Sequence, residues 1–167
     1  EEHDHDHADE GHSHEYDPHV WLSPERAIQM VQNITKQLVE AFPDRKEAFE
    51  KNAKAYIEKL TALHNDYTNA FKDAKQKNFV TQHTAFHYLA LDYGLNQVGI
   101  TGISPEAEPS AARLAELTKY VKENDIKIIY FEENASEKIA KTLAQEAGVE
   151  LAVLNPIESL TKEEMDK

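Results

Sequence analysis

Cysteine is absent from this 167-residue chain, and glycine, proline and tryptophan are scarce, with five, six and one residue. Without cysteine there are no disulfides or thiolate zinc sites, which leaves His, Asp and Glu as the only strong metal ligands. No apolar run approaches the roughly 20 residues of a membrane-spanning helix. The net charge of −13 argues against binding nucleic acid or anionic membranes. This negative charge suits a cationic ligand, although a need for solubility alone would also explain it.

The first 16 residues are acidic, rich in histidine and without hydrophobic periodicity. Residues 1–15 hold seven carboxylates and five histidines, namely His3, His5, His7, His12 and His14. Such a segment buries too little apolar surface to offset its chain entropy, so we expect 1–16 to be disordered. Histidine-rich tracts bind divalent metals. We interpret this one as a weak, multi-site zinc-collecting loop, with an inert linker as the alternative, because ordering a loop opposes tight binding.

Residues 17–76 are predicted to form a helical spine. Ser23-Pro24-Glu25 is a strong helix start, and Pro43-Asp44 ends that helix and begins a second one that runs to about residue 74. The apolar face of the first helix comprises Ile28, Val31, Ile34 or Thr35, Leu38 and Phe42, and that of the second comprises Phe49, Ala53, Tyr56, Leu60, Leu63, Tyr67 and Ala70. The heptad-like steps of the second helix fit either a coiled coil or a single helix packed on other elements. His64 is expected to serve surface or packing roles.

From residue 77 to 167 the pattern changes to short strands alternating with helices. Strands are expected at 79–81, 95–100, 127–131 and 150–154, and helices at 84–93, 110–124 and 136–147. This alternation predicts an α/β domain with a four-stranded parallel sheet flanked by helices.

Three candidate metal ligands stand at or near positions where such a sheet binds ligands, beyond the carboxyl ends of its strands. His83 follows the first strand, Glu158 lies four residues past the fourth, and His19 precedes the spine in Asp17-Pro18-His19. Two imidazoles and a carboxylate suit a divalent first-row metal, zinc foremost. The wide separation of these residues makes spacing alone a weak signal.

Several neighbouring residues keep open roles. His87 could pair with His83 as a metal clip on one helical face, or could support the site indirectly. Glu106 and Glu108 are either hydrogen-bond acceptors for ligand histidines or solvated charges. Glu132 and Glu133, which follow a strand, are interpreted as helix caps or contacts to another lobe.

A zinc-dependent hydrolase is the main alternative function, because His/His/Glu plus a water is a catalytic zinc arrangement. The sequence contains neither His-Glu-x-x-His nor Gly-x-Ser-x-Gly, and no acid or base group stands out. We therefore do not expect an enzyme. Metal buffering or adhesion at the cell surface is a further alternative, and adhesion would not require His83.

Three motifs together resemble the zinc/manganese-specific solute-binding proteins of ABC importers. They are Asp17-Pro18-His19-Val20-Trp21-Leu22-Ser23-Pro24, Thr81-Gln82-His83-Thr84-Ala85-Phe86-His87-Tyr88-Leu89, and the segment from Gly102 to Ser110. The resemblance implies two α/β lobes joined by a long helix, with the metal between the lobes. It places His19, His83 and Glu158 at three ligand positions. Histidine at the second position favours zinc over manganese, which remains possible.

The same resemblance implies how this chain relates to a parent protein. Residues 1–16 would be the acidic loop, 17–76 the end of the first lobe and the helical spine, and 77–167 the second lobe. We expect the rest of the first lobe, with a fourth histidine ligand, and a lipidated N-terminal anchor to belong to that parent. The implied role is extracellular zinc capture for a membrane permease. Apolar surface left uncovered could support self-association of the fragment.

Overall fold

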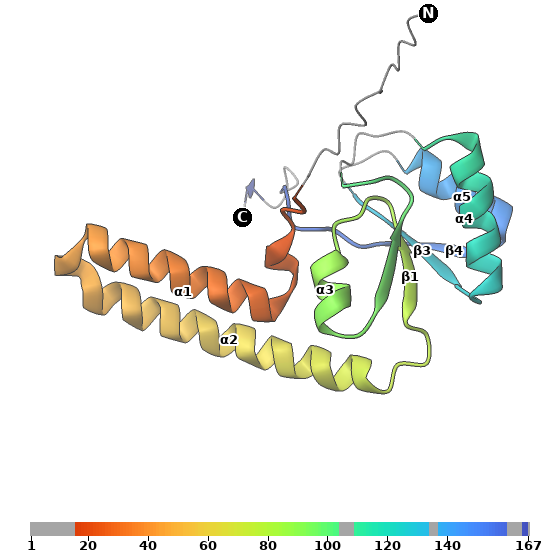
Figure 1. Cartoon of the computed structure of the whole chain (residues 1–167). Coiled ribbons are helices and arrows are strands. Elements are labelled where there is room, and N and C mark those ends of the chain that lie inside the picture. The colour runs from red at the N-terminus through yellow and green to blue at the C-terminus, as the bar shows by residue number, and fades with distance from the viewer. Residues whose placement is uncertain (1–15, 104–108, 134–136, 160–164, 167) are drawn as a thin grey trace, which may run out of the picture.

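The computed structural model describes residues 16–103, 109–133, 137–159 and 165–166. A helical hairpin projects from one side of a small α/β unit, as Figure 1 shows. The α/β prediction is confirmed. Within the described residues, no helix combines the length and the apolar character needed to cross a membrane.

The hairpin consists of α1 (Pro24–Ala41) and α2 (Lys46–Lys72), joined by the 3-10 turn η2 (Pro43–Arg45). The predicted helix start at Ser23-Pro24 and the break at Pro43 are confirmed. Proline suits these positions because its missing N–H costs nothing in a first turn. A second 3-10 turn, η1 (Val20–Leu22), precedes α1.

The buried faces of the two helices differ in part from the predicted ones. Thr35 rather than Ile34 lies on the covered side of α1, and Phe42 is 55% exposed. On α2 the exposed side carries Tyr56, Leu63 and Ala70, whereas the residue after each of them is partly buried: Ile57, His64 and Phe71. The prediction that Tyr56, Leu63 and Ala70 lie on the buried face was therefore wrong, because an α-helix repeats every 3.6 rather than 3.5 residues and the buried side drifts from a heptad-like pattern.

The end of α2 packs on the α/β unit through aromatic rings. The rings of Tyr67 and Phe71 lie 5.5 and 6.1 Å from the ring of Tyr93, centroid to centroid. His64 Nδ1 lies 3.0 Å from the hydroxyl of Tyr93. The packing role expected for His64 is what the structure shows.

Four parallel strands form the sheet in the order β2-β1-β3-β4. They are β1 (Asn78–Thr81), β2 (Asn96–Gly99), β3 (Ile128–Phe131) and β4 (Glu150–Val153). The chain moves outward in one direction from β1 to β2 and in the other from β3 to β4. The crevice of such a sheet opens between its two central strands, at their carboxyl ends. These two strands are β1 and β3.

Each face of the sheet has its own apolar core. Helices α4 (Ala111–Glu123) and α5 (Lys138–Ala147) cover one face, and Val80, Leu117, Val121, Ile129 and Leu143 are essentially inaccessible between them and the strands. On the other face, Leu22, Ala85 and Phe86 pack with Trp21, Phe79 and Leu154. This second cluster joins the start of the hairpin to the sheet.

The helix predicted over 84–93 begins later, as α3 (His87–Asp92). Residues 82–86 instead form a loop held by the segment after β2. The Thr84 N–H donates to the Gly102 carbonyl at 2.9 Å, and the Thr84 hydroxyl donates to the Thr101 carbonyl at 3.0 Å. Gly99 permits this approach, because a Cβ there would lie 2.5 Å from the Thr101 carbonyl oxygen. The other predicted elements differ from the observed ones by one or two residues at their ends.

Candidate metal centre

His19 is fixed at the entrance of the hairpin, directly before η1. Its side chain is almost wholly buried. The Asp17 carboxylate accepts hydrogen bonds from the His19 backbone N–H at 3.0 Å and from ring Nδ1 at 2.5 Å. The Tyr88 hydroxyl donates to the Asp17 carbonyl at 3.1 Å. Because Nδ1 is held by Asp17, the other ring nitrogen of His19, Nε2, faces the candidate centre.

His83 lies in the loop after β1, at the crevice between the two central strands. It is fully buried, and its backbone carbonyl accepts from the Thr81 hydroxyl at 2.7 Å and the Gln97 amide at 3.1 Å. Its ring Nδ1 forms a short hydrogen bond with the carboxylate of Glu132. As with His19, this contact leaves Nε2 directed at the centre.

Glu132 follows β3 on the opposite side of the crevice from His83. It is 8% exposed, and its backbone N–H donates to the Gln82 side-chain oxygen at 3.2 Å. The interpretation of this residue as a cap or lobe contact was wrong, because its carboxylate contacts His83. The missing information was the strand order: only a sheet in which β1 neighbours β3 brings the ends of these two strands together.

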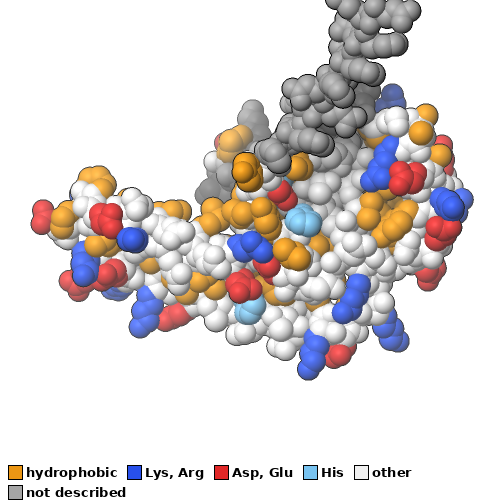
Figure 2. All heavy atoms as spheres, in the orientation of Figure 1, with side chains coloured by type: hydrophobic (Ala, Val, Ile, Leu, Met, Phe, Trp, Pro, Cys, Tyr) orange, Lys and Arg blue, Asp and Glu red, His pale blue; other side chains and the backbone are white. Residues whose placement is uncertain are grey.

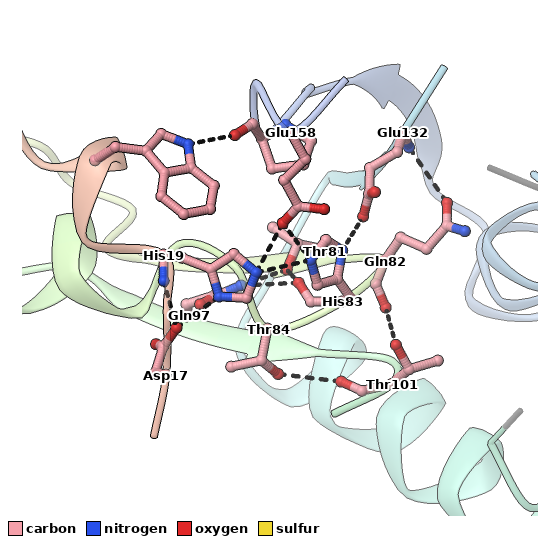
Figure 3. Close-up of polar contacts among 12 residues, drawn as sticks. Asp17, His19, Thr81, Gln82, His83, Thr84, Gln97, Thr101, Glu132 and Glu158 are labelled. Atoms are coloured by element: carbon pink, nitrogen blue, oxygen red, sulfur yellow. Dashed lines mark hydrogen bonds and ion pairs between the residues drawn. The ribbon is translucent and has the colours of Figure 1, made fainter. Parts of the chain in front are cut away.

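Glu158 completes the cluster from the segment after β4. Its Oε1 lies 2.7 Å from His19 Nε2 and 3.3 Å from His83 Nε2, and the two Nε2 atoms are 3.3 Å apart. Figure 3 shows the three side chains converging, with Asp17 and Glu132 on the outer side of the imidazoles. The ligand atoms of all three predicted residues lie within 4.8 Å of one another.

The cluster is rich in negative charge and in lone pairs. Burial by itself lowers the pKa of His83, but the hydrogen bond to Glu132 and the charges of Glu132 and Glu158 raise that pKa above the ordinary value for histidine. With both Nδ1 atoms directed at carboxylates, two Nε2 atoms and one carboxylate oxygen face each other. Three electron-pair donors at these distances require a proton or a metal cation between them.

The remaining predicted residues do not join this cluster or cannot be placed. His87 is exposed on α3, and its ring lies 5.8 Å from that of Tyr88. Glu133 is exposed and pairs with Asn155. Glu106, Glu108 and the five histidines of the N-terminal segment (His3, His5, His7, His12 and His14) lie outside the described residues.

Comparison with known proteins gives the class to which this fold and centre belong. Residues 1–167 match the family described as the zinc-uptake complex component A, periplasmic, or ZnuA. The chain belongs to this family.

Two curated relatives show which proteins of this family the chain resembles in sequence. The chain is 66% identical over 164 residues, 98% of its length, to the zinc-binding lipoprotein AdcA of Streptococcus pneumoniae, of which it spans 33%. It is 57% identical over 155 residues, 93% of its length, to the high-affinity zinc uptake system protein ZnuA of Bacillus subtilis, of which it spans 49%. The chain thus spans between a third and a half of these curated relatives.

Solved structures agree with the fold. The Zn(II)-bound ZnuA-like domain of S. pneumoniae AdcA superimposes with a TM-score of 0.76 at 64% identity, covering 90% of this chain and 57% of that one. The laminin-binding protein Lmb of Streptococcus agalactiae gives a TM-score of 0.83 at 43% identity, covering 90% of this chain and 60% of that one. Its structure is described as that of a bifunctional protein with adhesin and metal-transporting activity.

Proposed function

We propose that this chain is the zinc-binding part of the solute-binding component of an ABC importer for zinc. His19, His83 and Glu158 supply three of the ligands to the transported ion. The supporting observation is that one donor atom from each residue, drawn from segments far apart in sequence, faces a common centre. Membership of the ZnuA family and the zinc-binding names of the relatives support zinc as the cargo.

The distances fit a tetrahedral ion. With metal–nitrogen bonds of about 2.05 Å, the ligand atoms of tetrahedral zinc lie about 3.3 Å apart. His83 Nε2 lies 3.3 Å from both of its neighbours in the cluster. Only the 2.7 Å separation of His19 Nε2 and Glu158 Oε1 is short, and those two atoms would part by about 0.6 Å on binding.

The donor set favours zinc over manganese. Two imidazole nitrogens and one carboxylate suit zinc, whereas Mn²⁺ prefers sites dominated by oxygen. Three ligands leave a fourth position open. In the proposed arrangement, residues 17–76 end a first lobe and form the spine, 77–167 form the second lobe, and the fourth ligand comes from the rest of the parent protein.

The same proposal assigns the setting and the partners. The parent protein is extracellular, held at the membrane by a lipidated N-terminus, and delivers zinc to an ABC permease. Residues 1–16 collect zinc weakly for the site. Figure 2 shows apolar side chains on the exposed surface of the hairpin, and Ile34, Phe42 and Tyr56 are each more than half exposed. This surface is the candidate contact for self-association of the isolated chain.

Zinc calorimetry on the chain without residues 1–15 tests the proposal, with His83→Ala as the key variant. Binding of about one ion, lost in that variant and retained in a His87→Ala control, supports the assignment. His87 is a matched control because it is an exposed histidine four residues away. Manganese titrated in parallel should bind more weakly.

The proposal would be contradicted if deletion of residues 1–15 abolished zinc binding and His83→Ala had no effect on it. The protein would then be a surface metal buffer. Turnover of ester or peptide substrates that depends on zinc and His83 would instead support the hydrolase alternative.

Adhesion is a second candidate function, because the related Lmb is described as both adhesin and metal transporter. An adhesin role predicts that His83→Ala retains binding to an extracellular matrix protein such as laminin. Loss of zinc binding without loss of that adhesion would separate the two functions.

A further inference from the structure

The backbone that carries Glu158 adopts an unusual conformation. Ile157, directly before it, has φ of +56°, a value that β-branched residues rarely adopt because of steric strain. The Ile157 side chain is 73% exposed, so its own packing does not hold the turn in place. Strained backbone persists only where surrounding contacts determine it.

A hydrogen bond from the hairpin provides such a contact. The indole Nε1–H of Trp21 donates to the Pro156 carbonyl at 2.9 Å, across 135 residues of sequence. Pro156 is buried, and the Trp21 ring packs in the same apolar cluster as Leu154. The contact therefore lies immediately before the strained residue.

Trp21 also lies beside another proposed ligand. It is two residues after His19, and the two ring centroids are 5.5 Å apart. Pro156 is two residues before Glu158. The Trp21–Pro156 hydrogen bond thus connects the segment after His19 to the segment before Glu158 and fixes the two segments relative to each other.

Glu158 depends on its backbone for orientation. Its side chain is 30% exposed, and among the described residues the hydrogen bonds and ion pairs of its carboxylate are those with the two imidazoles. In the part of the chain that the structure describes, we identify no contact from outside the cluster that holds this carboxylate, whereas Asp17 and Glu132 hold the two histidines. The position of its carboxylate then follows from the turn at 156–157.

We propose that Trp21 is a positioning residue that aims Glu158 at the metal centre through the Pro156 carbonyl. This inference rests on the proposed function, since it assumes that Glu158 is a ligand. It assigns the only tryptophan of the chain a role in metal affinity that does not involve coordination. Supporting contacts of this kind typically change metal affinity by 10- to 100-fold.

The test is a double-mutant cycle with Trp21→Phe and Glu158→Gln, measured as zinc affinity by competition with a chromogenic chelator. Trp21→Phe keeps an aromatic ring and removes the N–H donor. We expect Trp21→Phe to weaken zinc binding about tenfold in the wild-type background. In the Glu158→Gln background the loss should be less than about twofold, because Trp21 acts only through Glu158 and that ligand is already lost.

Tyr88→Phe is the matched control. It removes one hydrogen bond, from the Tyr88 hydroxyl to the Asp17 carbonyl, on the His19 side of the centre. Its effect should be the same in both backgrounds. Ile157→Pro, which forces φ to about −65°, should weaken binding as Glu158→Gln does and add nothing to it.

The outcomes separate this inference from the proposed function. If Glu158→Gln leaves zinc affinity unchanged, the ligand assignment fails and the inference fails with it. If Glu158→Gln weakens binding but Trp21→Phe does not, or acts equally in both backgrounds, only the positioning role is overturned.

Discussion

Removing the carboxylate of Glu132 should weaken zinc binding without removing a ligand. Its hydrogen bond with His83 lies in a buried environment, with 0% of the His83 side chain and 10% of the Glu132 side chain exposed. A hydrogen bond to a charged partner contributes about 1.5–3 kcal/mol, and a support for a metal ligand is worth about 10- to 100-fold in affinity, which is about 1.4–2.7 kcal/mol. The two estimates agree.

Two variants divide this effect. Glu132→Gln retains an oxygen that accepts from Nδ1 but loses the charge, so we expect a loss of about tenfold. Glu132→Ala also leaves the buried Nδ1–H unpaired, so we expect a loss approaching 100-fold. The assay is zinc competition at constant pH, with Glu146→Gln, an exposed residue on α5, as the control.

The pH dependence has a defined sign. In the proposed centre zinc would bind the deprotonated Nε2 of His83. The pKa of His83 is raised chiefly by Glu132, so wild-type zinc affinity should increase as pH rises through that raised pKa. In Glu132→Gln the increase should begin at lower pH. The zinc-free fold should behave in the opposite way. Protonated His83 stabilises the zinc-free folded protein below the pKa of about 6.5 that histidine has in an unfolded chain. This stabilisation is lost as pH rises through the raised pKa of His83 in the folded protein.

Unchanged affinity in Glu132→Ala would refute this reasoning. So would an equal loss in the Glu146→Gln control, because a remote carboxylate contributes only long-range charge. A normal loss of affinity with an unshifted pH profile would show that Glu132 orients the ring without influencing its proton.

Three further predictions concern the surrounding structure. Asp92→Asn breaks a paired contact with Arg26 at 2.7 and 2.8 Å and should lower the free energy of unfolding by about 1.5–3 kcal/mol in urea melts. The hydrogen bond from Arg26 lowers the pKa of Asp92. The stabilisation is therefore present above the pKa of Asp92 in the unfolded chain and is lost as pH falls through its pKa in the folded protein. A difference in unfolding free energy between wild type and Asp92→Asn that stays constant in acid would contradict this reasoning. Gly99→Ala places a Cβ 2.5 Å from a backbone oxygen and should cost about 1–3 kcal/mol; an unchanged melting temperature would show that the loop yields. Zinc should alter the fluorescence of Trp21, the only tryptophan, with no change expected in His83→Ala, and a response that persists in that variant would point to a different site.

Local patterns were sufficient for the order of the elements and for choosing the three candidate ligands, which the structure brings together. Hydrophobic spacing distinguished the helical hairpin from the strand–helix alternation, since the two periods are properties of a few neighbouring residues. His83 was predicted because it follows a strand, and it indeed lies at the carboxyl end of β1. His19 was selected by its motif, and Glu158 by its place after the last strand.

Local patterns were insufficient wherever a partner decided the outcome. The covered side of α2 includes Ile57 and His64 in place of Tyr56 and Leu63, because contact with α1 and Tyr93, not the heptad, selects which apolar residues are buried. The start of α3 at His87 rather than at residue 84 depends on hydrogen bonds to the segment after β2. Neither partner is visible from the helix sequence itself.

The sequence by itself determined an α/β protein with a helical spine, a cysteine-free set of candidate ligands and a composition suited to a cation. Only the tertiary structure decided that β1 and β3 are neighbours, and with that the contact of Glu132 with His83. It also decided the contact of Trp21 with Pro156. The physical reason is that helix and strand patterns follow from neighbouring residues, whereas strand order and contacts across more than 100 residues follow from how the whole chain packs.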